Sequence, residues 1–386
     1  MSIARCVPHV LFVTGTRADF SKIKGTAESL IREGWKVTFF VTGMHMLETY
    51  GATFLEVRKI AGAEQYEYVN QREGDPLDLV FSKTVLGFSD WIHEHCPDLV
   101  IVHGDRVEAK ACAFVCATNY IRCVHIEGGE VSGTIDEVFR HCVTKLAHHH
   151  FVCSETAARN VVSLGEDPNR VVLMGSPELD THAAEMSVKL DEVRRYYEIP
   201  FEEYGIVVFH PVTSEVQTIG QQAQDLFNSL AQSGRDFVVI ASNNDPGAKS
   251  IMDVVEQQDL TRFRTLPSMR FEYFSILFRN ASLMVGNSSA GVREAPFLGV
   301  PSINVGSRQT GRSSAASVFN VEAREHDEIT RYIDKQWNKR FERCTEFGDG
   351  NSVVRFVNEL KKREFWEIPM QKHFFRSDGE NIKMQR

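Results

Sequence analysis

The sequence predicts an α/β chain of two doubly wound, Rossmann-like domains with a central cleft. Short runs rich in Val, Ile and Phe alternate with longer amphipathic stretches from one end of the chain to the other. The runs are continuously apolar, which is typical of parallel strands that helices cover on both faces. The same alternation begins again after a polar segment at 178–204, so we expect a second domain to start there.

The first half contains six apolar runs and three long stretches with helical spacing. We expect strands at 9–14, 36–42, 98–103, 122–126, 149–153 and 170–174. We expect helices at 18–33, 77–95 and 136–148. The N-terminal stretch 7–13 is short, is broken by Pro8 and lacks a small-residue cleavage site, so it predicts a first core strand and not a signal peptide.

The second half repeats this pattern with shorter runs. We expect strands at 205–209, 236–241, 283–285 and 301–305, and helices at 218–233 and 289–298. The predicted domains are therefore 1–180 and 181–363. The remaining segment, 364–386, carries Trp366, Phe374 and Phe375. So many aromatic residues predict that this segment packs back on the first domain.

The composition and the cysteine spacing exclude several classes of protein. The 386 residues carry a formal net charge of −9, which excludes a general attraction to nucleic acid or to an anionic membrane. No apolar run is long enough to span a bilayer. The 8 cysteines form no Cys-x-x-Cys pair and no zinc spacing, so we expect reduced thiols in a cytoplasmic protein. We interpret the tandem histidines 148–150 as a helix end and not a metal site, because adjacent side chains point in different directions.

Polar residues follow the predicted strands, at the edge where open parallel sheets bind ligands. After the first strand, a turn at Gly15 opens a helix whose first turns carry Arg17 and Ser21, and both could face an anion. The alternative is a helix capped by Thr16 with a surface arginine. The chain has no Gly-x-Gly-x-x-Gly and no Gly-x4-Gly-Lys-Ser/Thr, which argues against a nicotinamide cofactor and a P-loop.

Carboxylates gather after two neighbouring strands of the first half. Asp105 follows the strand at 98–103, Glu127 follows the strand at 122–126, and Asp136 lies one helical turn before Arg140. Clustered carboxylates shift one another's pKa values, which suits acid–base catalysis. A surface ion pair and acidic residues that favour a helix N-terminus are the alternatives.

The second half offers groups that suit a diphosphate. In the loop that begins at Gly286, backbone N–H groups, the hydroxyls of Ser288 and Ser289 and the positive end of a helix converge. A plain helix cap is the alternative for this loop. Glu294 could accept the two ribose hydroxyls, and Lys249 and Arg308, with Arg17 of the first half, could neutralise the diphosphate. These groups predict a nucleotide-linked substrate.

Together these motifs resemble the UDP-N-acetylglucosamine 2-epimerase family. The segments that carry the resemblance occur in order at 15–19, 43–45, 103–106, 125–130, 132–136, 210–213, 286–289 and 306–312. The run Ser-Gly-Thr-Ile-Asp at 132–136 is similar to the hydrolysing branch, because non-hydrolysing relatives carry a Pro-Glu-Glu type sequence there. The resemblance implies the glycosyltransferase-B fold, a homodimer or homotetramer, and no metal or redox cofactor.

The resemblance also implies roles for individual residues. The implied catalytic residues are Asp105, Glu127, Asp136 and His210, with Arg140, His45 and Asp180 as further candidates. The implied nucleotide-binding residues are Arg17, Ser21, Arg106, His210, Asn243, Lys249, Leu266, Ser288, Ser289, Glu294 and Arg308. The implied reaction converts UDP-N-acetylglucosamine and water to N-acetylmannosamine and UDP through a 2-acetamidoglucal, for the synthesis of sialic-type acids.

Several alternatives stay open at this point. The same chemistry on UDP- or GDP-N,N'-diacetylbacillosamine would serve legionaminic acid synthesis. A glycosyltransferase of the same fold would share the diphosphate site, and a nucleotide-sugar sensor would bind without catalysis. The base of the nucleotide, the division of acid and base roles among the three carboxylates, the oligomeric state and any allosteric control also stay open.

Overall fold

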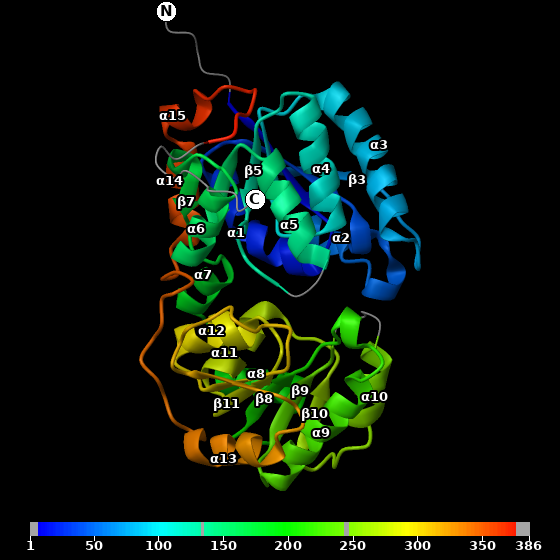
Figure 1. Ribbon diagram of the computed structural model, residues 1–386, viewed down its shortest axis with the longest axis vertical. Helices are drawn as coiled ribbons and strands as arrows, with labels where there is room; N and C mark the ends of the chain where they lie inside the picture. Colours follow the sequence, from blue (N-terminus) through cyan, green and yellow to red (C-terminus); the bar gives the residue numbers. More distant parts are fainter. Residues whose placement is uncertain (1–6, 133–134, 243–246, 376–386) are drawn as a thin grey trace, which may run out of the picture. The chain divides into compact units, whose positions relative to one another are not determined.

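The computed structural model describes residues 7–132, 135–242 and 247–375 and divides the chain into two compact units (Figure 1). Unit 1 contains residues 7–130, 135–177 and 351–375, and unit 2 contains residues 131–132 and 178–350. Each unit is built on a wholly parallel sheet, so the predicted α/β class with two doubly wound sheets is confirmed. Asn243, one of the expected binding residues, lies outside the described residues.

The unit 1 sheet has seven strands in the order β3-β2-β1-β4-β5-β6-β7. The strands are β1 (His9–Thr14), β2 (Lys36–Val41), β3 (Ala63–Glu67), β4 (Leu99–His103), β5 (Cys123–Ile126), β6 (His149–Val152) and β7 (Val171–Leu173). The helices are α1 (Arg17–Arg32), α2 (Phe54–Val57), α3 (Leu77–His95), α4 (Val107–Thr118), α5 (Ile135–Leu146), α6 (Glu155–Ser163), α14 (Ser352–Leu360) and α15 (Arg363–Trp366). The strand order reverses between β1 and β4, which makes their carboxyl ends the switch point where such sheets bind ligands.

Helices cover both faces of this sheet, which explains why its central strands are apolar throughout. Val10 and Phe12 of β1 pack on one face with residues of α1 and α14, and Leu11 and Val13 pack on the other with α3, α4 and α5. Thr16 caps α1, because its side chain accepts from the N–H of Asp19 while the Asp19 carboxylate accepts from the N–H of Thr16.

The unit 2 sheet has six strands in the order β10-β9-β8-β11-β12-β13. The strands are β8 (Gly205–Val208), β9 (Phe237–Ile240), β10 (Phe263–Leu266), β11 (Leu283–Gly286), β12 (Ser302–Val305) and β13 (Val318–Val321). The helices are α7 (Glu178–Ala183), α8 (Leu190–Tyr197), α9 (Ile219–Gln232), α10 (Ala248–Val255), α11 (Phe271–Arg279), α12 (Ala290–Leu298) and α13 (His326–Gln336). The switch point of this sheet lies between β8 and β11.

Three strands and the end of one helix differ from the sequence-based expectations. Strands β3, β10 and β13 were not expected; they lie at sheet edges, where one side of a strand stays partly exposed and the apolar run is interrupted. The expectation that 148–150 form a helix end was wrong. Helix α5 stops at Leu146, and His149 and His150 are buried in β6.

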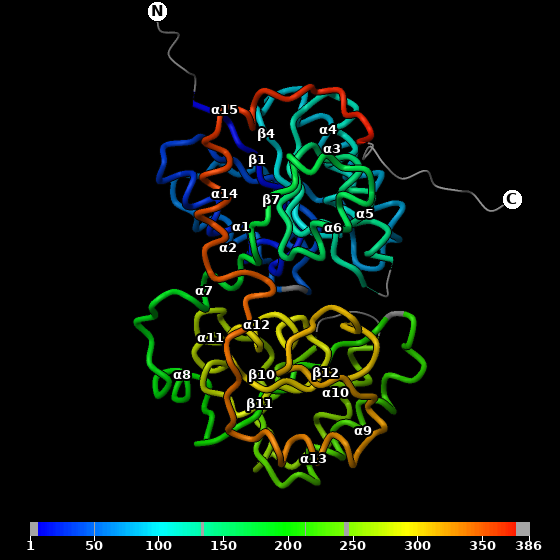
Figure 2. Tube along the Cα trace, turned by 60° about the vertical axis from the view of Figure 1, so that its left-hand side comes forward, coloured from blue at the N-terminus to red at the C-terminus, as the bar shows by residue number. Residues whose placement is uncertain are grey.

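After residue 350 the chain returns to unit 1, where α14 lies beside α1 (Figure 2). Phe365 and Trp366 of the C-terminal segment pack on the core of the same unit. Backbone carbonyls of this segment contact the tandem histidines: His149 Nε2 lies 3.1 Å from the Phe365 oxygen, and His148 Nε2 lies 3.1 Å from the Met370 oxygen. Burial lowers the pKa of His149 to about 3, so its ring is neutral. These partners explain why histidines are tolerated inside a buried strand.

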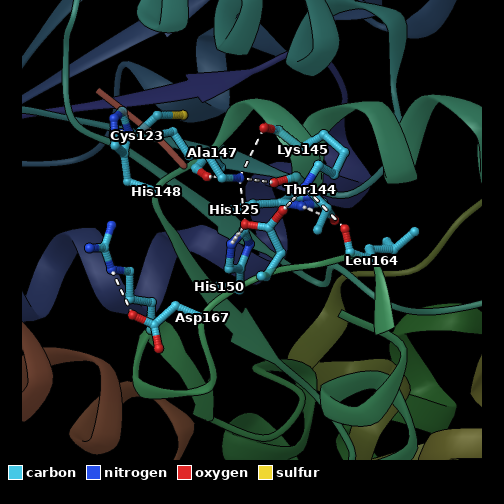
Figure 3. Close-up of polar contacts among 12 residues, drawn as sticks. Cys123, His125, Thr144, Lys145, Ala147, His148, His150, Leu164 and Asp167 are labelled. Carbon is cyan, nitrogen blue, oxygen red and sulfur yellow. Dashed lines mark hydrogen bonds and ion pairs between the residues drawn. The ribbon is translucent and has the colours of Figure 1, made fainter. Parts of the chain in front are cut away.

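A buried carboxylate, Glu166, holds the end of this segment in place. Its oxygens lie 2.6 Å from Lys145 Nζ, 2.5 Å from Lys372 Nζ and 3.0 Å from His150 Nε2. Lys372 also donates to the carbonyls of Thr144, Lys145 and Ala147, at and just after the end of α5. Figure 3 shows these three residues close to one another. A lysine at the C-terminus of a helix satisfies free carbonyls and interacts well with the helix dipole.

Among the described residues, no helix combines the length and the apolar character needed to cross a membrane.

Candidate active site

The loop after β1 is fixed by hydrogen bonds. Thr14 Oγ1 donates to Asp19 Oδ1 at 2.5 Å, and the N–H of Gly15 donates to Asp19 Oδ2 at 3.0 Å. His45 is buried next to this loop, with Nε2 2.9 Å from Thr14 Oγ1 and Nδ1 2.7 Å from Thr53 Oγ1. Burial lowers the pKa of His45, so a neutral ring bridges the two hydroxyls. This geometry gives His45 a role in holding the loop.

The helix that follows presents Arg17 and Ser21 near the switch point. Arg17 is the first residue of α1 and lies half-exposed, with Nε 3.5 Å from a Glu56 oxygen. Ser21 is exposed and donates to the carbonyl of Ala18 at 2.8 Å. An exposed ion pair of this length is weak, so the Arg17 guanidinium can exchange Glu56 for a stronger anion.

Asp105 and Arg140 form an ion pair at the end of β4. Arg140 lies on α5, is buried, contacts Asp105 Oδ2 through Nη2 and donates to the carbonyl of Glu130 at 3.0 Å. Asp105 itself is half-buried. Its carboxylate is therefore fixed in orientation on one side and still reaches the open edge of the sheet.

Glu127 directly follows β5 and is the most enclosed of the three candidate carboxylates. Lys22 Nζ lies 2.9 Å from both of its oxygens, and His103 Nε2 lies 3.0 Å from Oε2. The backbone of Glu127 has φ +67°, a left-handed conformation that is costly for glutamate. Strained residues of this kind persist where the surrounding structure holds them, often at functional sites.

Arg106 and Asp136 complete the polar edge of unit 1. Arg106 Nε lies 3.3 Å from Glu108 Oε2, and the charge of Glu108 raises the pKa of Arg106, with smaller effects from Asp19 and Asp136. Asp136 is exposed on the first turn of α5. The structure thus brings Asp136 within the electrostatic reach of Arg106, as expected for a shared site.

Three residues of this edge, Lys22, His103 and Glu108, were missed as candidates from the sequence. His103 lies in the motif at 103–106, and Lys22 lies on the helix predicted at 18–33, so both could have been chosen as candidate site residues. Glu108 could not, because α4 is apolar nearly all round and gives no helical period from which to place it.

In unit 2, the side chain of Asn287 ties the two strands of the switch point together. The N–H of His210 donates to Asn287 Oδ1, and Asn287 Nδ2 donates to the carbonyl of His210, both at 2.7 Å. Gly286 precedes it with φ +134°, and a Cβ there would lie 2.0 Å from the carbonyl oxygen of Val208. Only glycine therefore permits this close approach of β11 to β8.

The expected diphosphate-binding groups surround this junction. Arg308 donates to the carbonyl of Asn287 at 3.0 Å, and Ser288 and Ser289 lie half-buried at the start of α12. Burial, with a smaller effect of the Arg308 charge, lowers the pKa of His210 to about 3, so this histidine is neutral at physiological pH. Hydroxyls, a neutral ring and a guanidinium beside a helix N-terminus form a site that favours an anion.

The remaining expected residues of unit 2 differ in their surroundings. Glu294 is buried on α12, where its Oε2 contacts Nε2 of the buried His182 of α7. Lys249 is exposed on the first turn of α10, Leu266 is buried as the last residue of β10, and Asp180 is half-buried in α7. His182 was another residue that the sequence did not single out.

Comparisons with known proteins agree with this arrangement. The family described as UDP-N-acetylglucosamine 2-epimerase matches residues 29–361. A UDP-N-acetylglucosamine 2-epimerase of Neisseria meningitidis serogroup B is 40% identical over 95% of this chain and 98% of its own. A UDP-N,N'-diacetylbacillosamine 2-epimerase (hydrolyzing) of Legionella pneumophila is 30% identical over 92% of this chain and 96% of its own.

The fold is also that of solved structures. A UDP-GlcNAc 2-epimerase from Neisseria meningitidis bound to UDP-GlcNAc superposes with a TM-score of 0.77 at 18% identity, over 91% of this chain and 99% of that chain. Two sheets with switch points, the match to the family over most of the chain and the 40% identical relative lead to one conclusion. The chain belongs to the UDP-N-acetylglucosamine 2-epimerase family.

Proposed function

We propose that this protein is a hydrolysing 2-epimerase that converts UDP-N-acetylglucosamine and water to N-acetylmannosamine and UDP. The observation that carries the proposal is the pair of carboxylates beside the switch point, with Asp105 and Glu127 following the adjacent strands β4 and β5. Acid–base chemistry at a sugar carbon requires such groups, whereas binding alone does not. The 40% identical relative, itself a UDP-N-acetylglucosamine 2-epimerase, supports the substrate.

Unit 2 supplies the leaving-group site in this proposal. The diphosphate takes the N–H groups at the start of α12, the hydroxyls of Ser288 and Ser289, and the charge of Arg308. His210 offers a neutral ring that can donate one hydrogen bond. Since the C2 proton is weakly acidic, stabilisation of the departing UDP carries much of the barrier.

Unit 1 supplies the proton transfers. A carboxylate removes the C2 proton, the C–H electron pair forms the C1–C2 double bond, and the C1–O bond breaks as UDP leaves with its electrons. Water then adds across the double bond of the 2-acetamidoglucal, with its oxygen on C1 and a proton delivered to the opposite face of C2. Asp105, Glu127 and Asp136 are the acid and base candidates for these steps.

The experiment follows the products directly. Purified protein is incubated in D2O with UDP-N-acetylglucosamine, with UDP- and GDP-N,N'-diacetylbacillosamine in parallel, and the products are identified by NMR. We expect UDP and free N-acetylmannosamine with deuterium at C2. Preferred turnover of a diacetamido substrate would instead support legionaminic acid synthesis, which the 30% identical Legionella relative keeps open. Product only after an acceptor is added would indicate a glycosyltransferase, and binding without turnover would indicate a sensor.

We also propose that the protein is a cytoplasmic homodimer or homotetramer. Helices α3, α4 and α5 carry exposed apolar side chains, among them Leu86 (63% exposed), Val138 (54%) and Phe114 (42%). Exposed apolar side chains on neighbouring helices are typical of interfaces between subunits. The described cysteines are all free, which fits a reducing compartment. Light scattering of the purified protein, repeated with Leu86→Glu, tests the assembly; a monomeric wild type would contradict it.

A further inference from the structure

We propose that His182 is a positioning residue that makes the nucleotide site select ribose over deoxyribose by orienting Glu294. The inference rests on the proposed function, because it takes Glu294 as the acceptor of the ribose hydroxyls. His182 does not touch the nucleotide in this proposal; it acts through the Glu294 carboxylate.

The argument starts from a buried chain of three side chains. The His182 side chain is fully buried, its Nδ1 lies 2.6 Å from Ser275 Oγ, and its Nε2 contacts Glu294 Oε2. The ring centroids of Phe271 and Phe278 lie 5.4 and 6.3 Å from that of the imidazole and pack against it. The imidazole is therefore a rigid support for the glutamate.

The two hydrogen bonds of the ring also fix its tautomer. A carboxylate oxygen can only accept, so Nε2 must carry a proton and donate to Glu294. In the neutral ring Nδ1 is then an acceptor, and the Ser275 hydroxyl donates to it. Ser275 thus keeps the imidazole donor directed at Glu294, in the way that outer partners orient the ligands of a metal.

This contact leaves half of the carboxylate for a ligand. Among the described residues, His182 is the one hydrogen-bond partner of Glu294, and it occupies Oε2. Glu294 keeps 7% of its surface exposed, so Oε1 and the second lone pair of Oε2 remain for hydroxyl donors. A glutamate held this way does not lose rotamer freedom when the nucleotide binds, whereas an unsupported one does.

A preorganised acceptor gives selectivity as well as affinity. When a site is built to bind a hydroxyl, an analogue that lacks the hydroxyl leaves a buried acceptor unpaired and binds more weakly. Glu294 fixed by His182 should therefore penalise 2'-deoxyUDP. A mobile Glu294 could turn toward water and would discriminate less.

The test compares UDP with 2'-deoxyUDP by calorimetry in four full-length proteins. We expect the wild type to prefer UDP by about 10-fold or more, from the loss of one hydrogen bond to a charged group. His182→Leu should weaken UDP binding by about 10-fold or more and 2'-deoxyUDP binding by less, because the deoxynucleotide keeps only its 3'-hydroxyl for Glu294, so the preference for UDP should fall. His182→Gln, which keeps a donor near the Nε2 position, should restore part of the preference.

The matched control uses a second histidine of unit 2. His326 Nδ1 lies 2.7 Å from Ser229 Oγ and its Nε2 lies 3.9 Å from Asp225, a similar chain on α13 and α9. His326→Leu should leave the preference unchanged. A folded His182→Leu that keeps the full preference would overturn the inference, and Ser275→Ala supplies the same test if His182→Leu does not fold.

The inference and the proposed function fail differently. A wild type that binds both nucleotides equally would overturn the inference while the release of N-acetylmannosamine still supports the proposed function. With substrate, His182→Leu should raise KM and leave kcat within about threefold, because ribose binding is common to the ground state and the transition state.

Discussion

The two switch points share a strand order but carry opposite kinds of side chains. In unit 1, each carboxylate at the sheet edge has a cationic or histidine partner: Glu127 has Lys22 and His103, and Asp105 has Arg140. In unit 2, the edge carries hydroxyls, an amide and a guanidinium around neutral His210. In the proposed function the sheet supplies only the position, while the residues after each strand decide between proton transfer and anion binding.

The largest expected effect is the loss of kcat when the candidate catalytic carboxylates of unit 1 are replaced. Glu127→Gln and Asp105→Asn should each lower kcat by about 1000-fold or more, since each removes a group that exchanges protons in the transition state. The affinity for UDP should change by less than about threefold, because neither carboxylate is among the groups expected to bind the nucleotide. Steady-state kinetics and calorimetry measure the two quantities.

Glu137→Gln is the matched control for these variants. Glu137 lies on the first turn of α5, next to Asp136, and its oxygen is 3.7 Å from His141 Nε2. Its replacement should leave kcat within about twofold. Near-normal turnover of Glu127→Gln and Asp105→Asn would remove the acid–base assignment. Deuterium entry at C2 in the variants would show which carboxylate takes the proton.

The positions of the polar residues at both switch points could be predicted from the sequence, because these residues follow continuous apolar runs. Strands β1 and β8 are buried on both faces, so their apolar runs are unbroken and the residues that follow them are easily located. Strand β3 escaped prediction because Glu64, Gln65 and Glu67 interrupt it at the sheet edge. Helix α4 escaped because it is apolar on nearly every side.

The partners of the site residues could not be predicted, for a different reason. Lys22 meets Glu127 across 105 residues of sequence, and His182 meets Glu294 across 112. Such pairs depend on which helix covers which strand end, and no local pattern in one sequence encodes that. The sequence therefore identifies the carboxylates but not the side chains that set their orientation.

The next prediction concerns Glu166, a carboxylate of unit 1 that takes no part in the proposed reaction and so contrasts with Glu127. Glu166 is buried among Lys145, His150 and Lys372. Glu166→Gln should lower the free energy of unfolding by about 3 kcal/mol, since it leaves the largely buried Lys372 without its counter-ion. At a temperature where the variant is folded, kcat should stay within about twofold of the wild type. Denaturant unfolding and kinetics separate this carboxylate from Glu127.

The pH dependence of stability gives an independent check on Glu166. Burial alone raises its pKa, but the hydrogen bonds and charges of His150, Lys372 and Lys145 outweigh burial and lower the pKa to about 2. In the unfolded chain this carboxyl takes up its proton near pH 4.5, the ordinary value. The stabilisation is therefore complete above about pH 4.5 and is lost as the pH falls toward 2. The stabilities of wild type and Glu166→Gln should converge over this range; a constant difference would contradict the assignment.

A smaller effect is expected on UDP binding when Arg308 of unit 2 is replaced. Arg308→Met should weaken UDP binding by about 10- to 100-fold, through the loss of a charge-assisted contact to the diphosphate. The value of kcat should fall as well, by about 10-fold or more, because the proposed function uses the Arg308 charge to stabilise the departing UDP. Arg331→Met, which removes an exposed arginine paired with Glu328 on α13, is the control. Equal losses in both variants would mean that net charge, and not the site, holds the nucleotide.

The smallest expected effect concerns the protonation of His210. Burial lowers its pKa to about 3, so the ring stays neutral between pH 5.5 and 8 and contributes no charge to the diphosphate site. The ratio of the UDP affinities of wild type and His210→Asn should therefore stay constant within about twofold over that range, although the phosphate itself titrates there. A ratio that rises below pH 6.5 would show a histidine that gains its proton with the ligand bound. His210 would then carry a positive charge at low pH, and the charge at the anion site of unit 2 would change with pH.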